Sequence, residues 1–336
     1  MSAADISALP LPWQNGQWQL LQRQRERDQL PHALLLAGPP AVGKRRFARA
    51  LANALLCLQP GADGLACGAC RACGLLAAGT HPDWEWLAPE EAGKAIKIDQ
   101  VRAVVDSVAQ TAQQGGRKLV VIEPAEALNR NAANALLKTL EEPSGSAVLL
   151  LITDAPGRLL PTIRSRCQRL DFPLPPEAAT RAWLEPLAVE PERLERALAE
   201  SGHRPLFARA LLDDDGINQR QELAKALAAV LTGRAGALAL AEQWQQRDWD
   251  MLLEWWQGRV AQALRIRLGG QAPADDALLA VLMQCQPQAL FELLDRIQAL
   301  LGQSRGGGNP NRQLALENLL LQACELVRGN TRPGAW

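Results

Sequence analysis

Residues 38–45 are the first segment whose residue types and spacing could do chemistry, because they read G-P-P-A-V-G-K-R. In a phosphate-binding loop, backbone N–H groups of such a turn and of the following helix hold the phosphates, and a lysine reaches the terminal ones. Gly38, Gly43 and Lys44 are therefore candidate nucleotide-binding residues. A Ser or Thr hydroxyl should follow the lysine to ligate Mg²⁺, but the chain has Arg45 there, and a guanidinium cannot bind the metal. The loop predicts a degenerate nucleotide site.

The segments on either side of the loop support its placement but leave its chemistry open. Residues 33–36 predict a strand before it, and an apolar helical stripe follows it at Phe47, Ala48, Leu51 and Leu55. This strand–loop–helix context is the one that the motif requires. The alternative is a strand-to-helix turn whose glycines serve only backbone geometry. The two interpretations differ in whether the loop binds nucleotide.

The acidic half of an ATPase site is also incomplete. A working site places one acidic residue near Mg²⁺ and another near the attacking water, at the end of a buried strand. Residues 118–122 predict that strand, but it ends in Glu123-Pro124 instead of an adjacent Asp-Glu pair, and the next carboxylate is Glu126. Because the metal ligand and the acidic pair are both damaged, we expect no ATP hydrolysis by this chain alone.

Four of the seven cysteines fall within 17 residues, at Cys57, Cys67, Cys70 and Cys73. The spacing, with glycines between, suits four thiolates around one Zn²⁺ at about 2.3 Å from each sulfur. A disulfide framework is disfavoured because the chain shows no secretion signal, and the spacing does not match the Fe–S cluster motifs. We predict a structural zinc site with no open coordination position, and we expect Cys285 and Cys324 to be small buried residues.

Composition bounds the remaining possibilities. A length of 336 residues predicts two or three domains, and 48% hydrophobic with 21% charged residues is typical of a globular protein. The 36 basic and 36 acidic residues cancel, which excludes a freestanding, strongly basic nucleic-acid binder. No stretch approaches the roughly 20 apolar residues of a membrane span, so we expect a cytoplasmic protein without membrane contacts.

The first half of the chain alternates between predicted strands and helices, which indicates a parallel sheet with helices on both faces. Asp99 is the predicted cap of a valine-rich helix that residues 115–116 close. A helix is predicted over 131–142, stopped by Pro143, and a buried central strand over 147–152.

Beyond residues 173–176 the sequence predicts only helices. They are short over 177–212 and longer and amphipathic over 217–326, with interruptions at 269–270 and 306–310. Tryptophans in this region could form subunit contacts, but we expect most of them in the internal core. They are Trp244, Trp249, Trp255 and Trp256.

A basic cluster follows the predicted central strand, and its ordinary interpretation is a solvated helix end. Its arginines are Arg158, Arg164, Arg166 and Arg169. Taken with the cysteines and with N-A-L-L-K-T-L-E-E-P at 134–143, the S-R-C triplet at 165–167 resembles that of bacterial clamp-loader subunits of the AAA+ class. The resemblance extends over most of the chain, including residues 11–13, 32–35, 79–83, 311–317 and 319–321.

The resemblance implies three domains. These would be an α/β AAA+ core at 1–172 that includes the zinc module at 57–73, a small helical lid at 173–212 and an all-α collar at 213–336 that mediates oligomerisation. It further implies that Arg166 is presented in trans to the ATP of a neighbouring subunit. The implied partners are the loader's ATPase subunits and its delta subunit in a hetero-pentamer, and, through that complex, the sliding clamp and primed DNA.

Two other functions compete with this interpretation. A competent AAA+ motor, such as the loader's own ATPase subunit or a branch-migration helicase, is opposed by Arg45 and Pro124. A zinc-dependent DNA-binding protein is opposed by the cysteine module, which has Arg71 as its single basic residue between positions 57 and 73.

Overall fold

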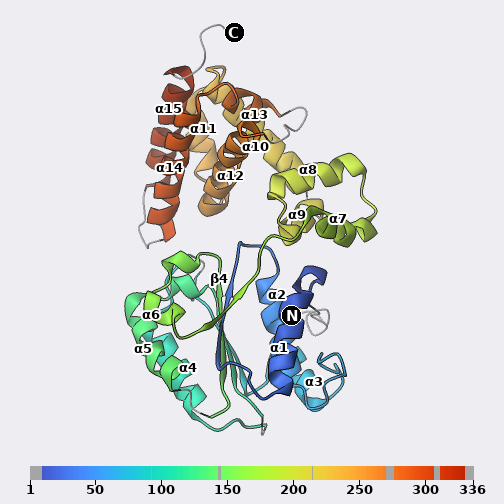
Figure 1. Cartoon of the computed structure of the whole chain (residues 1–336). Coiled ribbons are helices and arrows are strands. Elements are labelled where there is room, and N and C mark those ends of the chain that lie inside the picture. The colour runs from blue at the N-terminus through green and yellow to red at the C-terminus, as the bar shows by residue number, and fades with distance from the viewer. Residues whose placement is uncertain are drawn as a thin grey trace. The chain divides into compact units, whose positions relative to one another are not determined.

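The computed structural model describes residues 10–91, 93–114, 116–142, 145–213, 215–269, 276–305 and 311–329. It divides the chain into two compact units (Figure 1). Unit 1 comprises Met1–Val189 with His203–Arg209, and unit 2 comprises Glu190–Gly202 with Ala210–Trp336. The division into core, lid and collar at 172 and 212 stays a prediction.

Unit 1 contains a five-stranded sheet in which every strand pairing is parallel, in the order β2-β3-β4-β1-β5. The strands are β1 (Ala33–Ala37), β2 (Trp84–Leu87), β3 (Leu119–Ile122), β4 (Val148–Thr153) and β5 (Gln168–Asp171). All residues of β1, β3 and β4 are buried, as expected for continuous apolar runs in a sheet covered on both faces. The predicted parallel sheet is confirmed.

Helices cover both faces of this sheet, with α1 and α2 on one face and α4 and α5 on the other (Figure 1). Successive side chains of β1 alternate between the two cores: Leu34 and Leu36 face α2, and Ala33 and Leu35 face α5. The helices of this unit's core are α1 (Asn15–Glu26), α2 (Lys44–Leu56), α3 (Arg71–Ala78), α4 (Ile98–Ala109), α5 (Arg130–Glu141) and α6 (Pro161–Arg164).

Two predicted helix boundaries are wrong. Helix α4 begins at Ile98, because the side-chain oxygen of Gln100 accepts the Lys97 N–H at 3.0 Å; Asp99 lies inside the first turn and is not the cap. The same helix ends at Ala109, before the predicted stop at 115–116. Gly115 and the predicted stop Pro143 lie outside the described residues.

Among the described residues after β5 there are helices and turns but no strand, as predicted. The helices are α7 (Glu177–Leu184), α8 (Pro191–Ser201), α9 (Pro205–Asp213), α10 (Gly216–Leu231), α11 (Ala237–Trp244), α12 (Trp249–Arg267), α13 (Ala277–Leu282), α14 (Pro287–Arg305) and α15 (Arg312–Gly329). The predicted interruption after α12 is present at Gly269, whereas Gly270 and residues 306–310 lie outside the described residues. No helix in the described ranges is long and apolar enough to cross a membrane.

The core of unit 2 contains the four tryptophans singled out in the sequence, Trp244, Trp249, Trp255 and Trp256. Trp244 packs edge-to-face against Trp255 and Trp256, with ring centroids 6.2 and 6.4 Å apart, and Trp249 is also buried. Core packing is therefore the correct interpretation, and these side chains are not available for subunit contacts. The predicted burial of Cys285 and Cys324 is also confirmed.

A buried ion cluster attaches α8 to the rest of unit 2. The Arg259 guanidinium of α12, whose side chain is 3% exposed, lies 2.9 Å from Glu200 Oε1 of α8 and also pairs with Asp276. A buried arginine needs such counter-charges, because removing an isolated ion from water costs several kcal/mol. The cluster therefore joins α8 to other helices of unit 2.

Candidate functional site

The loop at residues 38–44 lies between the central strand β1 and the helix α2, where the sequence places it. Both of its outer glycines are required by the backbone itself. A Cβ on Gly38 would lie 2.1 Å from the carbonyl oxygen of Phe172, just after β5. Gly43 has φ +96°, and a Cβ there would lie 2.4 Å from Leu11 Cδ1. The structural interpretation of these two glycines therefore holds whether or not a phosphate is bound.

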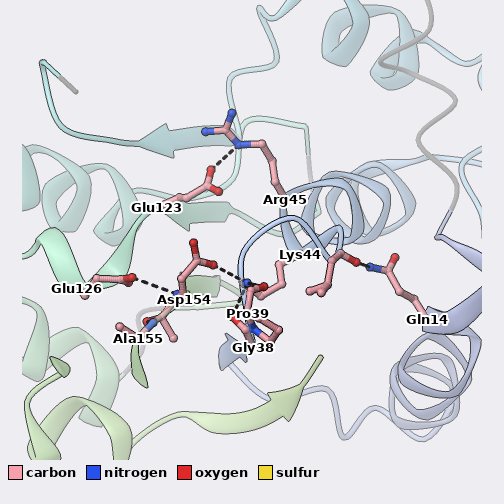
Figure 2. A network of polar contacts seen from close by, with 11 residues as sticks. Gln14, Gly38, Pro39, Lys44, Arg45, Glu123, Glu126, Asp154 and Ala155 are labelled. Carbon is pink, nitrogen blue, oxygen red and sulfur yellow. Dashed lines mark hydrogen bonds and ion pairs between the residues drawn. The ribbon is translucent and has the colours of Figure 1, made fainter. Parts of the chain in front are cut away.

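The side chain of Lys44, which follows Gly43 at the end of the loop, points back toward the loop (Figure 2). Its Nζ donates to the carbonyl oxygens of Gly38 and Pro39, both at 2.6 Å, and lies 2.5 Å from Asp154 Oδ1. The lysine side chain is 4% exposed. A phosphate group would have to displace these contacts to reach the ammonium group.

Arg45 forms an ion pair at the position where the metal hydroxyl is missing. Its Nε donates to Glu123 Oε2 at 2.6 Å (Figure 2). Its Cζ lies 5.4 Å from the ring centroid of Trp86, within cation–π range. The negative charge of Glu123, directly after β3, is therefore balanced by Arg45 of the same chain. A Mg²⁺ ion, which needs oxygen ligands, would meet a like charge there.

Glu126 does not complete an acidic pair with Glu123. In Figure 2 the two side chains point to different partners, and Glu126 Oε1 accepts the backbone N–H of Asp154 at 3.1 Å. Its other oxygen is buried without a hydrogen-bond partner among the described residues.

The sequence did not identify Asp154 as the ion-pair partner of Lys44. It follows β4, which lies next to β1, and the carboxyl ends of parallel strands meet at one edge of the sheet. An acidic residue directly after the buried run of β4 was the available signal.

The N-terminal turn also holds the loop. Gln14, which is fully buried, donates through Nε2 to the carbonyl oxygen of Val42 at 3.0 Å, and Trp13 donates to the same oxygen through Nε1 at 3.0 Å. These residues lie in and beside the 3-10 turn Pro12–Gln14, and Leu11 before it packs on Gly43. The segment 11–14 therefore fixes the conformation of the loop.

Arg166 lies in the turn between α6 and β5 and is one-third exposed. Its Nε donates to Glu141 Oε1 at 2.7 Å, and the pair joins the S-R-C triplet to the end of α5. Arg169, in β5, pairs instead with Asp171 at 2.7 Å, so the basic cluster is not one uniform surface.

The four predicted zinc ligands converge. Their Sγ atoms all lie within 4.8 Å of one another, and five of the six separations run from 3.5 Å for Cys57–Cys67 to 4.0 Å for Cys67–Cys73. Four sulfurs arranged tetrahedrally at 2.3 Å from a zinc ion would be about 3.8 Å apart, so the set fits the metal. Cys57 ends α2, Cys70 precedes α3, and Cys73 lies in the first turn of α3.

The chemistry of this thiol cluster also favours a bound cation. Backbone N–H groups donate to two of the sulfurs, from Cys67 to Cys57 Sγ at 3.3 Å and from Cys70 to Cys67 Sγ at 3.4 Å. Such donors stabilise thiolates, the form of cysteine that binds a metal ion. The cluster can hold a metal ion.

The parallel sheet covered by helices on both faces, with a strand–loop–helix segment at β1 and α2, has the α/β architecture that the resemblance to the AAA+ class predicts. Family models described as "DNA polymerase III, delta subunit" and "DNA polymerase III, delta subunit, C terminal" match residues 13–176 and 214–324. The DNA polymerase III subunit delta′ of Pseudomonas aeruginosa is 46% identical over 94% of this chain and 97% of its own length. The subunits delta′ of Escherichia coli and Bacillus subtilis are 34% and 32% identical, over 93% and 91% of this chain and 94% of each relative. The chain belongs to the family of DNA polymerase III subunit delta′.

Proposed function

We propose that this chain is the stator subunit of a bacterial clamp loader: it does not turn over ATP, but it controls hydrolysis by a neighbouring subunit. The proposal that the chain does not turn over ATP rests on the ion pair between Arg45 and Glu123. An internal cation occupies the carboxylate that should face Mg²⁺, and the loop has no second acid to activate water. Gly38 and Gly43 could contact phosphate through the backbone, but the Lys44 ammonium group could do so only after it releases a present partner such as Asp154.

For the control of a neighbouring subunit, we assign Arg166 to the active site of that neighbour. Negative charge moves toward the phosphate oxygens as ATP is cleaved, and a guanidinium fixed at the edge of the pocket stabilises that distribution. Arginines supplied in this way contribute about 10³–10⁵ in rate. Support comes from family membership and from the one-third exposure of Arg166 on a turn beside the sheet.

The four cysteines would hold one structural Zn²⁺. All four sulfurs of Cys57, Cys67, Cys70 and Cys73 face one another, which leaves no coordination position for a substrate. The metal would fix the segment between α2 and α3 and take no part in ATP chemistry.

The helical region would supply the contacts that assemble the complex. The proposed partners are ATPase subunits and the delta subunit in a hetero-pentamer, which would place the sliding clamp on primed DNA as part of the DNA polymerase III holoenzyme. On α15, Leu314 and Leu321 are 55% and 46% exposed and lie seven residues apart on one face of the helix, as expected for a packing surface. The collar at 213–336 and the lid at 173–212 follow from this assignment.

Co-elution with clamp-loader subunits, followed by a measurement of ATP hydrolysis, tests the proposal. The chain should co-elute with clamp-loader ATPase and delta subunits and raise their hydrolysis of ATP in the presence of clamp and primed DNA, while hydrolysing none alone. Separate elution, or Mg²⁺-dependent turnover by the isolated chain, would contradict it.

A further inference from the structure

The guanidinium of Arg166 contacts three residues of its own chain. Glu141 accepts from Nε at 2.7 Å and also pairs with a terminal nitrogen. The other terminal nitrogen donates to the carbonyl oxygen of Thr162 at 3.1 Å and to Ser165 Oγ at 3.4 Å. Bidentate binding of a phosphate uses two N–H groups on one edge of the guanidinium, and both edges include nitrogens held by these contacts, so a phosphate must compete with them before Arg166 can serve a neighbour.

This pairing is built on rigid backbone and is not a chance meeting of two mobile side chains. Glu141 is the last residue of α5, directly after the buried Leu140, and Arg166 directly precedes the buried Cys167. Helices α5 and α6 pack against each other, with Ile163 of α6 buried in the same core cluster as Leu140. The backbone therefore presents the carboxylate to the guanidinium at a fixed place.

The other arginines of the basic cluster are not held in this way. Arg158 and Arg164 are exposed and form no ion pair within the described part of the chain. Arg169 pairs within its own strand, two residues from its partner. A carboxylate supplied from 25 residues away in the sequence is thus specific to Arg166.

We propose that Glu141 is a positioning residue that holds Arg166 in a parked state until a neighbour's nucleotide phosphate outcompetes the carboxylate. This inference rests on the trans-acting role proposed for Arg166. Glu141 is 49% exposed, and ion pairs this exposed shift an equilibrium by about 1.5- to 5-fold. The ion pair is therefore strong enough to lower idle hydrolysis, meaning ATP hydrolysis without clamp and DNA, and weak enough to be displaced by a triphosphate.

The test uses the reconstituted clamp loader with ATP, and Glu141→Gln in this chain. The amide keeps the size and one hydrogen-bond acceptor but removes the charge. Hydrolysis without clamp and DNA should rise about 2- to 5-fold, and half-saturation by ATP should occur at lower concentration, whereas the fully stimulated rate should stay unchanged. The matched control is Glu142→Gln, an exposed neighbour for which the described residues show no ion pair, and it should alter neither quantity.

A double variant separates this inference from the proposed function. Glu141→Gln combined with Arg166→Ala should behave as Arg166→Ala alone, because the carboxylate acts only through the arginine. If Arg166→Ala lowers stimulated hydrolysis but Glu141→Gln leaves idle hydrolysis unchanged or lowers it, the parked state is wrong and the trans role stands. If Arg166→Ala has no effect, the trans role itself fails. An equal rise with Glu142→Gln would assign the effect to general surface charge and overturn the inference.

Discussion

Gly38→Ala tests whether the loop keeps its glycine for backbone packing or for phosphate. The added Cβ would lie 2.1 Å from the Phe172 carbonyl oxygen and 2.9 Å from its carbon, so the backbone must retreat by about 0.9 Å to reach the shortest separation that real contacts show, 3.0 Å. Phe172 cannot move freely, because its N–H donates to the Ala37 carbonyl oxygen at 2.7 Å. Overpacking against fixed backbone costs typically about 1–3 kcal/mol, and a weakened sheet hydrogen bond adds about 1 kcal/mol.

We therefore expect Gly38→Ala to destabilise unit 1 by about 2–4 kcal/mol without any ligand present. For a unit of this size, that corresponds to a melting transition lowered by roughly 5–15 °C, measurable by differential scanning calorimetry. Hydrogen exchange of peptides from β1 would assign the transition to the sheet. The control is Gly16→Ala in α1, where a Cβ meets nothing within 4 Å and alanine is the better helix residue. A ligand-free Gly38→Ala protein as stable as the wild type would refute the packing argument and leave phosphate approach as the reason for the glycine.

Three further predictions follow from the site and the core. Protein prepared without chelator under reducing conditions should carry about one zinc per chain, and Cys70→Ser should release it and loosen residues 57–80 in hydrogen exchange while the sheet survives; metal-free wild type would contradict this. The isolated chain should show no ATP turnover, and Arg45→Thr should not restore it, since Glu123-Pro124 after β3 still lacks an adjacent acidic pair; phosphate release by either protein in a Mg²⁺ assay would count against the damaged site. Arg259→Leu should destabilise unit 2 by about 3–5 kcal/mol because it leaves two partly buried carboxylates unpaired, whereas the exposed Arg265→Leu on the same helix should melt like the wild type.

The elements that the sequence predicted well carry strong local signals. Apolar runs at 33–36 and 147–152 favour buried interior strands, and the structure places strands at Ala33–Ala37 and Val148–Thr153. Four cysteines within 17 residues are close enough to be recognised together. The strand β5 was missed because its four residues, Gln168–Asp171, are mostly polar and only Leu170 is buried. It is an edge strand, identified by its pairing with β1 and not by its composition.

The ion pairs could not be predicted, since they join segments far apart in the sequence. Arg45 and Glu123 are 78 residues apart, and Lys44 and Asp154 lie still farther apart in the sequence. Spacing shows which charges exist, but the strand order decides which of them meet. The same holds for Glu141, which the sequence presents as one of two adjacent acids in a helix.

The structure also decides which control suits the arginine segment. Arg169 lies in the same basic cluster, but its removal would leave Asp171 without its partner. Arg164 is exposed, lies two residues from Arg166 and forms no ion pair within the described residues. It is the better matched substitution.

The most direct test of the central claim is clamp loading by complexes that contain Arg166→Ala or Arg164→Ala in this chain. We predict that both assemble, because each side chain lies on the surface, and that only Arg166→Ala lowers clamp loading and the ATP hydrolysis stimulated by clamp and primed DNA. The lost hydrolysis should equal the contribution of one active site, since an arginine in trans supplies about 10³–10⁵ of its rate. Wild-type loading and hydrolysis by an intact complex carrying Arg166→Ala, or equal losses with both variants, would contradict the account.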